Sequence, residues 1–228
     1  MGSEMCIRDR RRRGALHAKP KFLYARQIFS FGLSLIPHSI GGVILAMADR
    51  LFIGHFEGAK EVGLYSVAYQ VGAVMLLVGT SVNQAMAPAL FGLLKKRTEN
   101  SVLAKITLII GMGYVAFSTT LYFFAELIFR YFVSDKYIVA KDYFPYLLIG
   151  FLFQSLYFLF TNYLFYYNRT RLLAGITFGG ALLNLGLNYV LIKSYGPIGV
   201  AYSTAITWFF YFVAVSFFAV KIQRRAYV

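Results

Sequence analysis

The longest stretch without a charged residue runs from Val62 to Leu94 and constrains the fold more than any other feature. An α-helix needs about 20 apolar residues to cross a hydrocarbon layer of about 30 Å, and this stretch is longer than that. Small and polar residues recur within it at helical spacing, namely Ser66, Gln70, Ala73, Thr80 and Gln84. A membrane helix with such a stripe packs against other helices or lines a wet cavity, so the stretch indicates a membrane protein.

Five further charge-free segments support this interpretation. The six segments are 28–48, 62–94, 106–125, 143–168, 172–192 and 194–220, and none of the 23 basic or nine acidic residues lies inside them. Each is long enough to span a bilayer as a helix, in which every backbone polar group is satisfied internally. The sequence therefore predicts an all-α integral membrane protein with a six-helix unit at 27–228. The connections are too short for a separate soluble domain.

The basic residues are distributed unevenly between the two sides of the membrane. If the N-terminus is cytoplasmic, that side carries 17 lysines and arginines and the other side carries six. Because cytoplasmic loops are enriched in these residues, we expect both chain termini in the cytoplasm. The net charge of +14 thus indicates membrane orientation and no nucleic-acid partner. Residues 1–26 form a basic cytoplasmic leader, whose first ten residues resemble the translated read-through of a sequencing adapter.

Prolines and glycines mark expected bends and close contacts. Pro37 and Pro88 lie within the first and second spans, where each removes a backbone hydrogen bond and is a candidate hinge. Gly175 and Gly179 form a GxxxG pair that allows two helices to approach closely. The second and sixth spans begin with similar short segments, Gly63-Leu-Tyr-Ser and Gly199-Val-Ala-Tyr-Ser. This internal echo is a weak sequence repeat, and transporters are often built from repeats.

Amides and hydroxyls within the spans are candidates for lining a transport cavity. This set contains Gln70, Asn83, Gln84, Thr177, Asn184 and Asn188. Asn184 and Asn188 are four residues apart and share a helix face. They can hydrogen-bond a polar cargo or join neighbouring helices, and both interpretations remain open.

Ionisable residues close to the span ends are candidates for charge recognition or ion coupling. Asp49 and Arg50 either bind an ion or anionic substrate or simply mark the end of the first span. As sequence neighbours they face different directions on a helix, so we expect them to have different partners. His38 could carry protons or be a packed histidine, and Glu126 could pair with Arg130 four residues later.

Aromatic residues are concentrated in the fourth span, and we expect most of them to face lipid or form interfacial belts. Motifs of soluble and metal-dependent enzymes are missing. The sequence contains no GxSxG, HExxH or GxxxxGK[ST], and His17, His38 and His55 lack metal-ligand spacing. The one cysteine, Cys6, cannot form an internal disulfide. We therefore expect neither an enzyme nor a metal centre.

Three stretches resemble a known family. These are Asp49-Arg-Leu-Phe-Ile-Gly54, the run from Val62 to Pro88, and the run from Asn184 to Ala201. They resemble the polysaccharide-biosynthesis exporters (Wzx-type O-antigen flippases) of the multidrug/oligosaccharidyl-lipid/polysaccharide superfamily, and match the C-terminal half of such a protein. The resemblance implies a six-helix lobe of a MATE-like transporter, in which two lobes rock around a central cavity. Lys193 departs from the proline that the family often has after the fifth span.

The function implied by the resemblance is transfer of a polyprenyl-pyrophosphate-linked oligosaccharide across the bacterial inner membrane by alternating access. Its implied partners are that lipid-linked substrate, membrane lipids, an N-terminal lobe and polysaccharide polymerase machinery. No cofactor is expected beyond coupling H⁺ or Na⁺. The alternative is a multidrug or small-molecule exporter of the same superfamily. A polyprenyl-sugar-processing enzyme lacks the long extramembrane loop that it would need, and a non-transporting scaffold is a further alternative.

Overall fold

The protein is described by a computed structural model that covers Ile36, Ser39, Ile40, Gly42, Val43 and residues 47–226. These described residues form helices and turns and contain no strand. A helical segment at 47–56 is followed by α3 (Ala59–Lys95), α4 (Asn100–Phe123), α5 (Ala125–Phe132), the 3₁₀ segment η2 (Asp135–Asp142), α6 (Phe144–Tyr166), α7 (Thr170–Tyr195) and α8 (Pro197–Ala226).

Five helices in this part of the chain, α3, α4, α6, α7 and α8, are long and apolar enough to cross a membrane. They correspond to the second to sixth spans expected from the sequence. The third expected span ends two residues early, at Phe123, and the chain then continues into the short helix α5 and η2. The first expected span lies mostly outside the described residues, as do the candidates Pro37 and His38.

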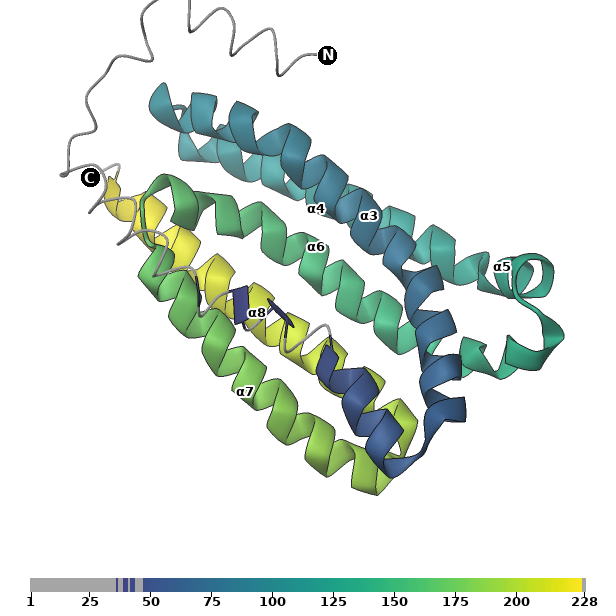
Figure 1. Ribbon diagram of the computed structural model, residues 1–228. Helices are drawn as coiled ribbons and strands as arrows, with labels where there is room; N and C mark the ends of the chain where they lie inside the picture. Colours follow the sequence, from purple (N-terminus) through teal and green to yellow (C-terminus); the bar gives the residue numbers. More distant parts are fainter. Residues whose placement is uncertain (1–35, 37–38, 41, 44–46, 227–228) are drawn as a thin grey trace, which may run out of the picture.

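Helix α6 is the centre of the bundle. It lies between α3 and α4 on one side and α7 and α8 on the other, and it packs most extensively against α8 and α3 (Figure 1). Because other helices surround α6, 50% of the residues in its most apolar 18-residue segment are buried. The corresponding share for α4 is 17%. The expectation that the aromatic residues of this span face lipid is therefore wrong. Phe144, Phe151, Tyr157 and Tyr163 are all at most 4% exposed and form part of the core.

The close helix contacts occur at glycines other than the expected pair. Gly175 and Gly179 have open space where a Cβ would lie, so the GxxxG expectation is wrong within the described structure. Instead, Gly180 faces the ring of Tyr211 in α8, and a Cβ there would lie 1.9 Å from the Cε1 atom of Tyr211. Gly79 of α3 packs in the same way against Ser155 of α6. These glycines allow α7 to approach α8, and α3 to approach α6.

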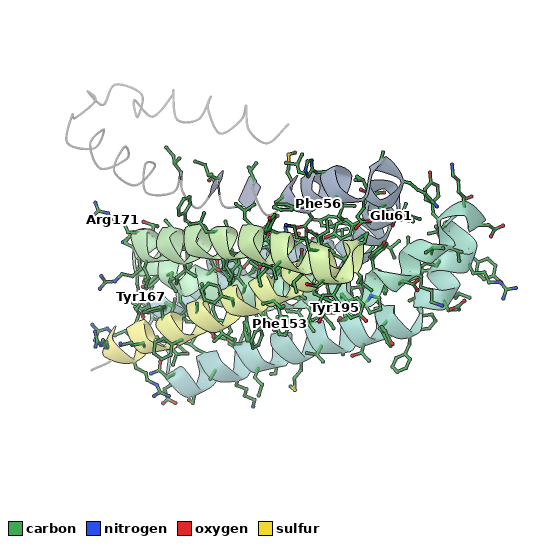
Figure 2. All side chains as sticks on the ribbon, turned by 90° about the horizontal axis from the view of Figure 1, so that it is seen from below. Phe56, Glu61, Phe153, Tyr167, Arg171 and Tyr195 are labelled. Carbon is green, nitrogen blue, oxygen red and sulfur yellow. The ribbon has the colours of Figure 1, made fainter. Side chains whose placement is uncertain are left out.

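The two ends of the bundle differ in charge, whereas its sides are apolar. Large side chains such as Leu77, Leu108, Phe123 and Phe217 are more than 60% exposed on the helix sides, as expected of a surface in contact with lipid. Figure 2 shows Arg171 at one end of the bundle and Glu61 towards the other. Charged residues thus lie at the helix ends, where the chain leaves the bilayer.

Candidate functional site: a buried carboxylate and a cavity between the helices

Asp49 is a buried carboxylate held by hydrogen bonds from three other helices. Its side chain is only 2% exposed. Tyr65 of α3 donates to Oδ2 at 2.6 Å, Thr204 of α8 donates to the same oxygen at 2.7 Å, and Asn188 of α7 donates to Oδ1 at 3.0 Å. Asp49 thus joins the first helical segment to three other helices, and its role in binding an ion or substrate stays a prediction. Neutral donors of this kind compensate part of the cost of burying the charge.

Two asparagines on one face of α7 extend this network into α8. Asn188 also donates to Asn184 at 3.2 Å, and Asn184 donates to Ser203 at 3.2 Å and to Thr207 at 3.3 Å. Both asparagine side chains are fully buried. Of the two interpretations left open by the sequence, this structure shows the one in which the amides join neighbouring helices. They do so next to the Asp49 carboxylate.

The turn between α7 and α8 brings the donors on these two helices together. Gly196 ends α7 with a positive φ of 64°, and Pro197 begins α8 directly afterwards. Glycine tolerates this left-handed backbone and proline favours the first helical position, so the two helices form a tight hairpin. Asn188 and Thr204 consequently lie at matching heights, where both reach Asp49.

One oxygen of the network lacks a hydrogen-bond donor. Asn188 Oδ1 is buried and has no hydrogen-bond partner. The neighbouring Arg50 attracts the charge of the Asp49 carboxylate electrostatically. Hard cations prefer oxygen ligands. The carboxylate, the asparagine oxygen and the hydroxyls of Tyr65 and Thr204 supply oxygens of that kind.

Arg50 contacts two α3 side chains that do not donate to Asp49, as expected for sequence neighbours that face different directions. Its Nε donates to Ser66 Oγ at 3.2 Å, and its guanidinium carbon lies 4.5 Å from the centre of the Tyr69 ring. Ser66 and Tyr69 follow Tyr65 on α3. The same stretch of α3 therefore contacts both Asp49 and Arg50. Arg50 is half-buried, and these two contacts fix the orientation of its side chain.

A second candidate site is a cavity of about 340 Å³ lined by residues of α3, α6, α7 and α8. Asn162 of α6 donates to Asn83 of α3 at 2.7 Å at this cavity, and Thr177 of α7 also lines it. Trp208 and Tyr157 contribute aromatic walls. Two of the expected cavity residues, Asn83 and Thr177, are therefore placed at the same cavity. A few polar groups among apolar and aromatic walls are typical of a binding pocket.

The remaining candidates do not join either site. Gln70, Gln84 and Pro88 are exposed on α3, which continues through Pro88 to Lys95. Glu126 forms its ion pair with Lys141 of η2, not with Arg130 on its own helix, because η2 packs against α5. Glu126 and Arg130 are both exposed.

The sequence interpretation missed Tyr65, Thr204 and Asn162 as site residues. A signal for the first two was present in the internal echo. Tyr65 belongs to the segment Gly63-Leu-Tyr-Ser, and Thr204 directly follows the segment that ends at Ser203. Both segments contribute hydroxyls to the Asp49 network. Nothing in the pattern around Asn162 distinguishes it from other polar residues in an aromatic span.

The comparison with known families decides the identity of this arrangement. Residues 35–190 match the MatE family. The chain belongs to the MatE family. Its helical fold resembles the MATE transporter VcmN of Vibrio cholerae in the bent form, with a TM-score of 0.66 at 17% identity. That match covers 90% of this chain and 47% of VcmN, and at this identity it concerns the fold alone.

Two relatives among known proteins carry names that refer to glycans or remain general. The chain is 29% identical over 199 residues to the probable low-salt glycan biosynthesis flippase Agl15 of Haloferax volcanii, covering 83% of this chain and 41% of that protein. It is 25% identical over 191 residues to the Lsg locus putative protein 1 of Haemophilus influenzae, covering 82% and 48% respectively. The chain thus spans less than half the length of these relatives.

Proposed function

We propose that this MatE-family protein forms part of a transporter that flips a polyprenyl-linked oligosaccharide across a bacterial inner membrane. The observation that carries the proposal is the 29% identity to a probable glycan biosynthesis flippase over 83% of the chain. The cavity at Asn83 and Asn162 supports it, because paired amides beside aromatic walls suit hydroxyl-rich cargo. The polyprenyl tail would remain in lipid while the polar part crosses by alternating access.

The Asp49 network is the proposed site of coupling to H⁺ or Na⁺. A charge change on Asp49 alters hydrogen bonds to α3, α7 and α8 at the same time. A ligand shifts a conformational equilibrium only if it binds the two states differently. A cation that depends on all three helices for its ligands meets this condition, because relative movement of the helices separates those ligands.

The test is complementation in a strain that lacks its own oligosaccharide flippase. The complete gene should restore surface glycan, whereas Asp49→Asn should reduce it at least tenfold at equal membrane abundance. Glu57→Gln is the matched control, because Glu57 is an exposed acid eight residues later. If the complete gene fails to restore surface glycan although the protein is present in the membrane, the glycan proposal is wrong.

A multidrug or small-molecule exporter is a second proposed function, and one observation favours it. Such an exporter is expected to use a buried acid, and Asp49 is buried. The same strain should then become more resistant to cationic dyes without regaining surface glycan. Resistance that depends on Asp49, without glycan, would support this second function over the first.

A further inference from the structure

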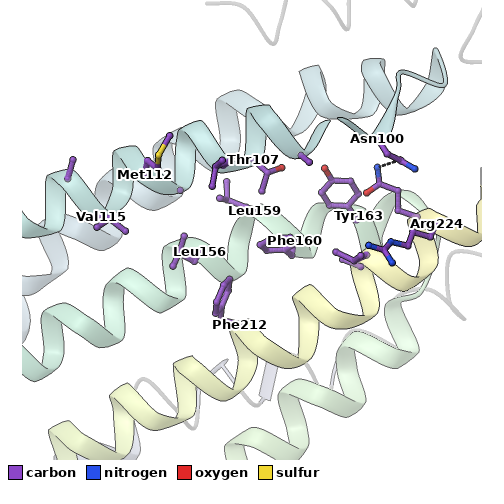
Figure 3. Close-up of a pocket in the computed structure, with 17 residues that line it drawn as sticks. Asn100, Thr107, Met112, Val115, Leu156, Leu159, Phe160, Tyr163, Phe212 and Arg224 are labelled. Atoms are coloured by element: carbon purple, nitrogen blue, oxygen red, sulfur yellow. Dashed lines mark hydrogen bonds between the residues drawn. The ribbon is translucent and has the colours of Figure 1, made fainter. Parts of the chain in front are cut away.

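An apolar groove runs along the outside of the bundle between α4 and α8, with α6 as its floor. Its volume is about 760 Å³ (Figure 3). Leu108 and Met112 of α4 form one wall, Phe212 of α8 forms part of the other, and Leu156 and Phe160 of α6 lie at the base. Lining residues on α4 extend from Asn100 to Ala116. At 1.5 Å per residue this is roughly 24 Å, longer than the hydrocarbon depth of one leaflet.

The groove ends in a polar and basic group at one end only. There Gln223 of α8 donates to Asn100 of α4 at 2.8 Å, and Arg224 lines the same opening. This end of the bundle carries nine described lysines and arginines and one described acid, Glu99. The opposite end carries six basic and six acidic residues in the described part. The groove therefore joins an apolar channel to a cationic opening.

We propose that this groove binds an anionic phospholipid, with an acyl chain between α4 and α8 and the phosphate at Arg224. The combination of a long apolar wall with a basic end matches the two parts of such a lipid. Acyl chains are already in hydrocarbon before they bind, so the apolar wall alone does not select between lipids. Selection comes from the head group. This inference does not depend on the transported substrate.

The test measures lipids retained by the purified protein in native mass spectrometry. Dioleoylphosphatidylglycerol and dioleoylphosphatidylcholine are added in equal amounts, because they share acyl chains and differ in net head-group charge. We expect preferential retention of the phosphatidylglycerol. Arg224→Gln should reduce that preference about fivefold, the factor expected for one cation near an anionic lipid surface. Arg225→Gln, an exposed neighbour outside the groove, should change it less than twofold.

A second pair of variants tests the groove itself. Leu108→Trp narrows the groove and should reduce retention of both lipids, whereas Ile109→Trp should leave retention unchanged. Both residues are more than half exposed on α4, but only Leu108 lines the groove, so both variants are expected to fold. Thermal melting of each variant confirms folding.

Four results would overturn the proposal. Equal retention of the two lipids would remove the anionic selectivity, and equal effects of Arg224→Gln and Arg225→Gln would indicate diffuse surface charge. Displacement of phosphatidylglycerol by an equimolar polyprenyl phosphate would assign the groove to that isoprenoid lipid instead. A cross-link between two copies through Leu108→Cys would assign it to a second copy of the chain.

Discussion

The carboxylate of Asp49 accepts hydrogen bonds from three helices, so substitutions there should separate charge from packing. Asp49→Asn preserves the shape and removes the charge, but its NH2 group cannot accept a hydrogen bond, so at least one of the three donors loses its acceptor. Asp49→Ala leaves buried donors without an acceptor, at a cost of about 1–3 kcal/mol for each group left unsatisfied. We therefore expect Asp49→Asn to melt above Asp49→Ala, because it keeps one acceptor oxygen, and to abolish cation-dependent transport.

Melting of the two variants in detergent, combined with transport by the complete protein, checks this expectation. Asp49→Ala should melt clearly below Asp49→Asn. If the two variants melt together, the hydrogen bonds from Tyr65 and Thr204 contribute little to stability. If Asp49→Asn still responds to an imposed cation gradient, coupling does not depend on this carboxylate.

The amide pair Asn83 and Asn162 allows a double-mutant cycle across the cavity between the helices. Their hydrogen bond of 2.7 Å joins α3 to α6. Hydrogen bonds between membrane helices average about 0.6 kcal/mol and seldom exceed about 1.7 kcal/mol. We expect Asn83→Leu and Asn162→Leu to show a coupling free energy in this range, measured by reversible unfolding in mixed micelles. A coupling near zero would indicate that both amides are satisfied by water in the cavity.

At the level of single residues, the sequence located the polar positions better than it assigned their roles. The i and i+4 spacing placed Asn184 and Asn188 on one face, as the structure confirms. Spacing along the chain could not predict which residues of different helices lie in contact. Asp49 and Asn188 are 139 residues apart, and their contact depends on how three helices pack. The same limit explains why Asn162 was missed, since its partner Asn83 lies on another helix.

At the level of helices, composition predicted the spans because a bilayer requires about 20 uninterrupted apolar residues. The second, fifth and sixth expected spans agree with α3, α7 and α8 within a few residues, except at the C-terminal end of α8, which continues from the expected Val220 to Ala226. Which helix lies at the centre was not predictable. In lipid an apolar side chain suits both the core and the outer surface, so the aromatic residues of α6 gave no indication of burial.

Glycine substitutions should distinguish true helix contacts from apparent ones. Gly180→Ala places a methyl group against the Tyr211 ring, whose hydroxyl donates to the carbonyl of Thr177 at 2.5 Å. Overpacking of this kind costs typically about 1–3 kcal/mol. Gly175→Ala meets open space and should be neutral or stabilising by up to about 1 kcal/mol, because alanine favours helices. Thermal melting of the two variants checks the difference, and a larger loss for Gly175→Ala would mean that this surface is covered by another segment.

At the level of the whole molecule, charge is separated along the bundle axis. The end formed by the C-terminus of α3, the start of α4, the α6–α7 turn and the C-terminus of α8 is strongly basic (Figure 1). The opposite end, which contains Asp49, α5 and η2, is balanced. Helices that run alternately through a membrane bring loops from distant parts of the chain to one side. The positive-inside rule then predicts that the basic end is cytoplasmic and that the Asp49 end faces outward.

Cysteine labelling provides a direct test of this orientation. Cys6 is the only cysteine, so Cys6→Ser gives a background free of thiols. Ser134→Cys adds a thiol at the exposed connection between α5 and η2, and Glu99→Cys adds one at the exposed connection between α3 and α4. A membrane-impermeant maleimide added to spheroplasts should label Ser134→Cys and should label Glu99→Cys only after lysis. Labelling of both variants after lysis is the control for thiol accessibility. The reverse pattern would place the basic end outside and, with it, the Asp49 network on the cytoplasmic side, where coupling to an inward cation gradient would need a different path.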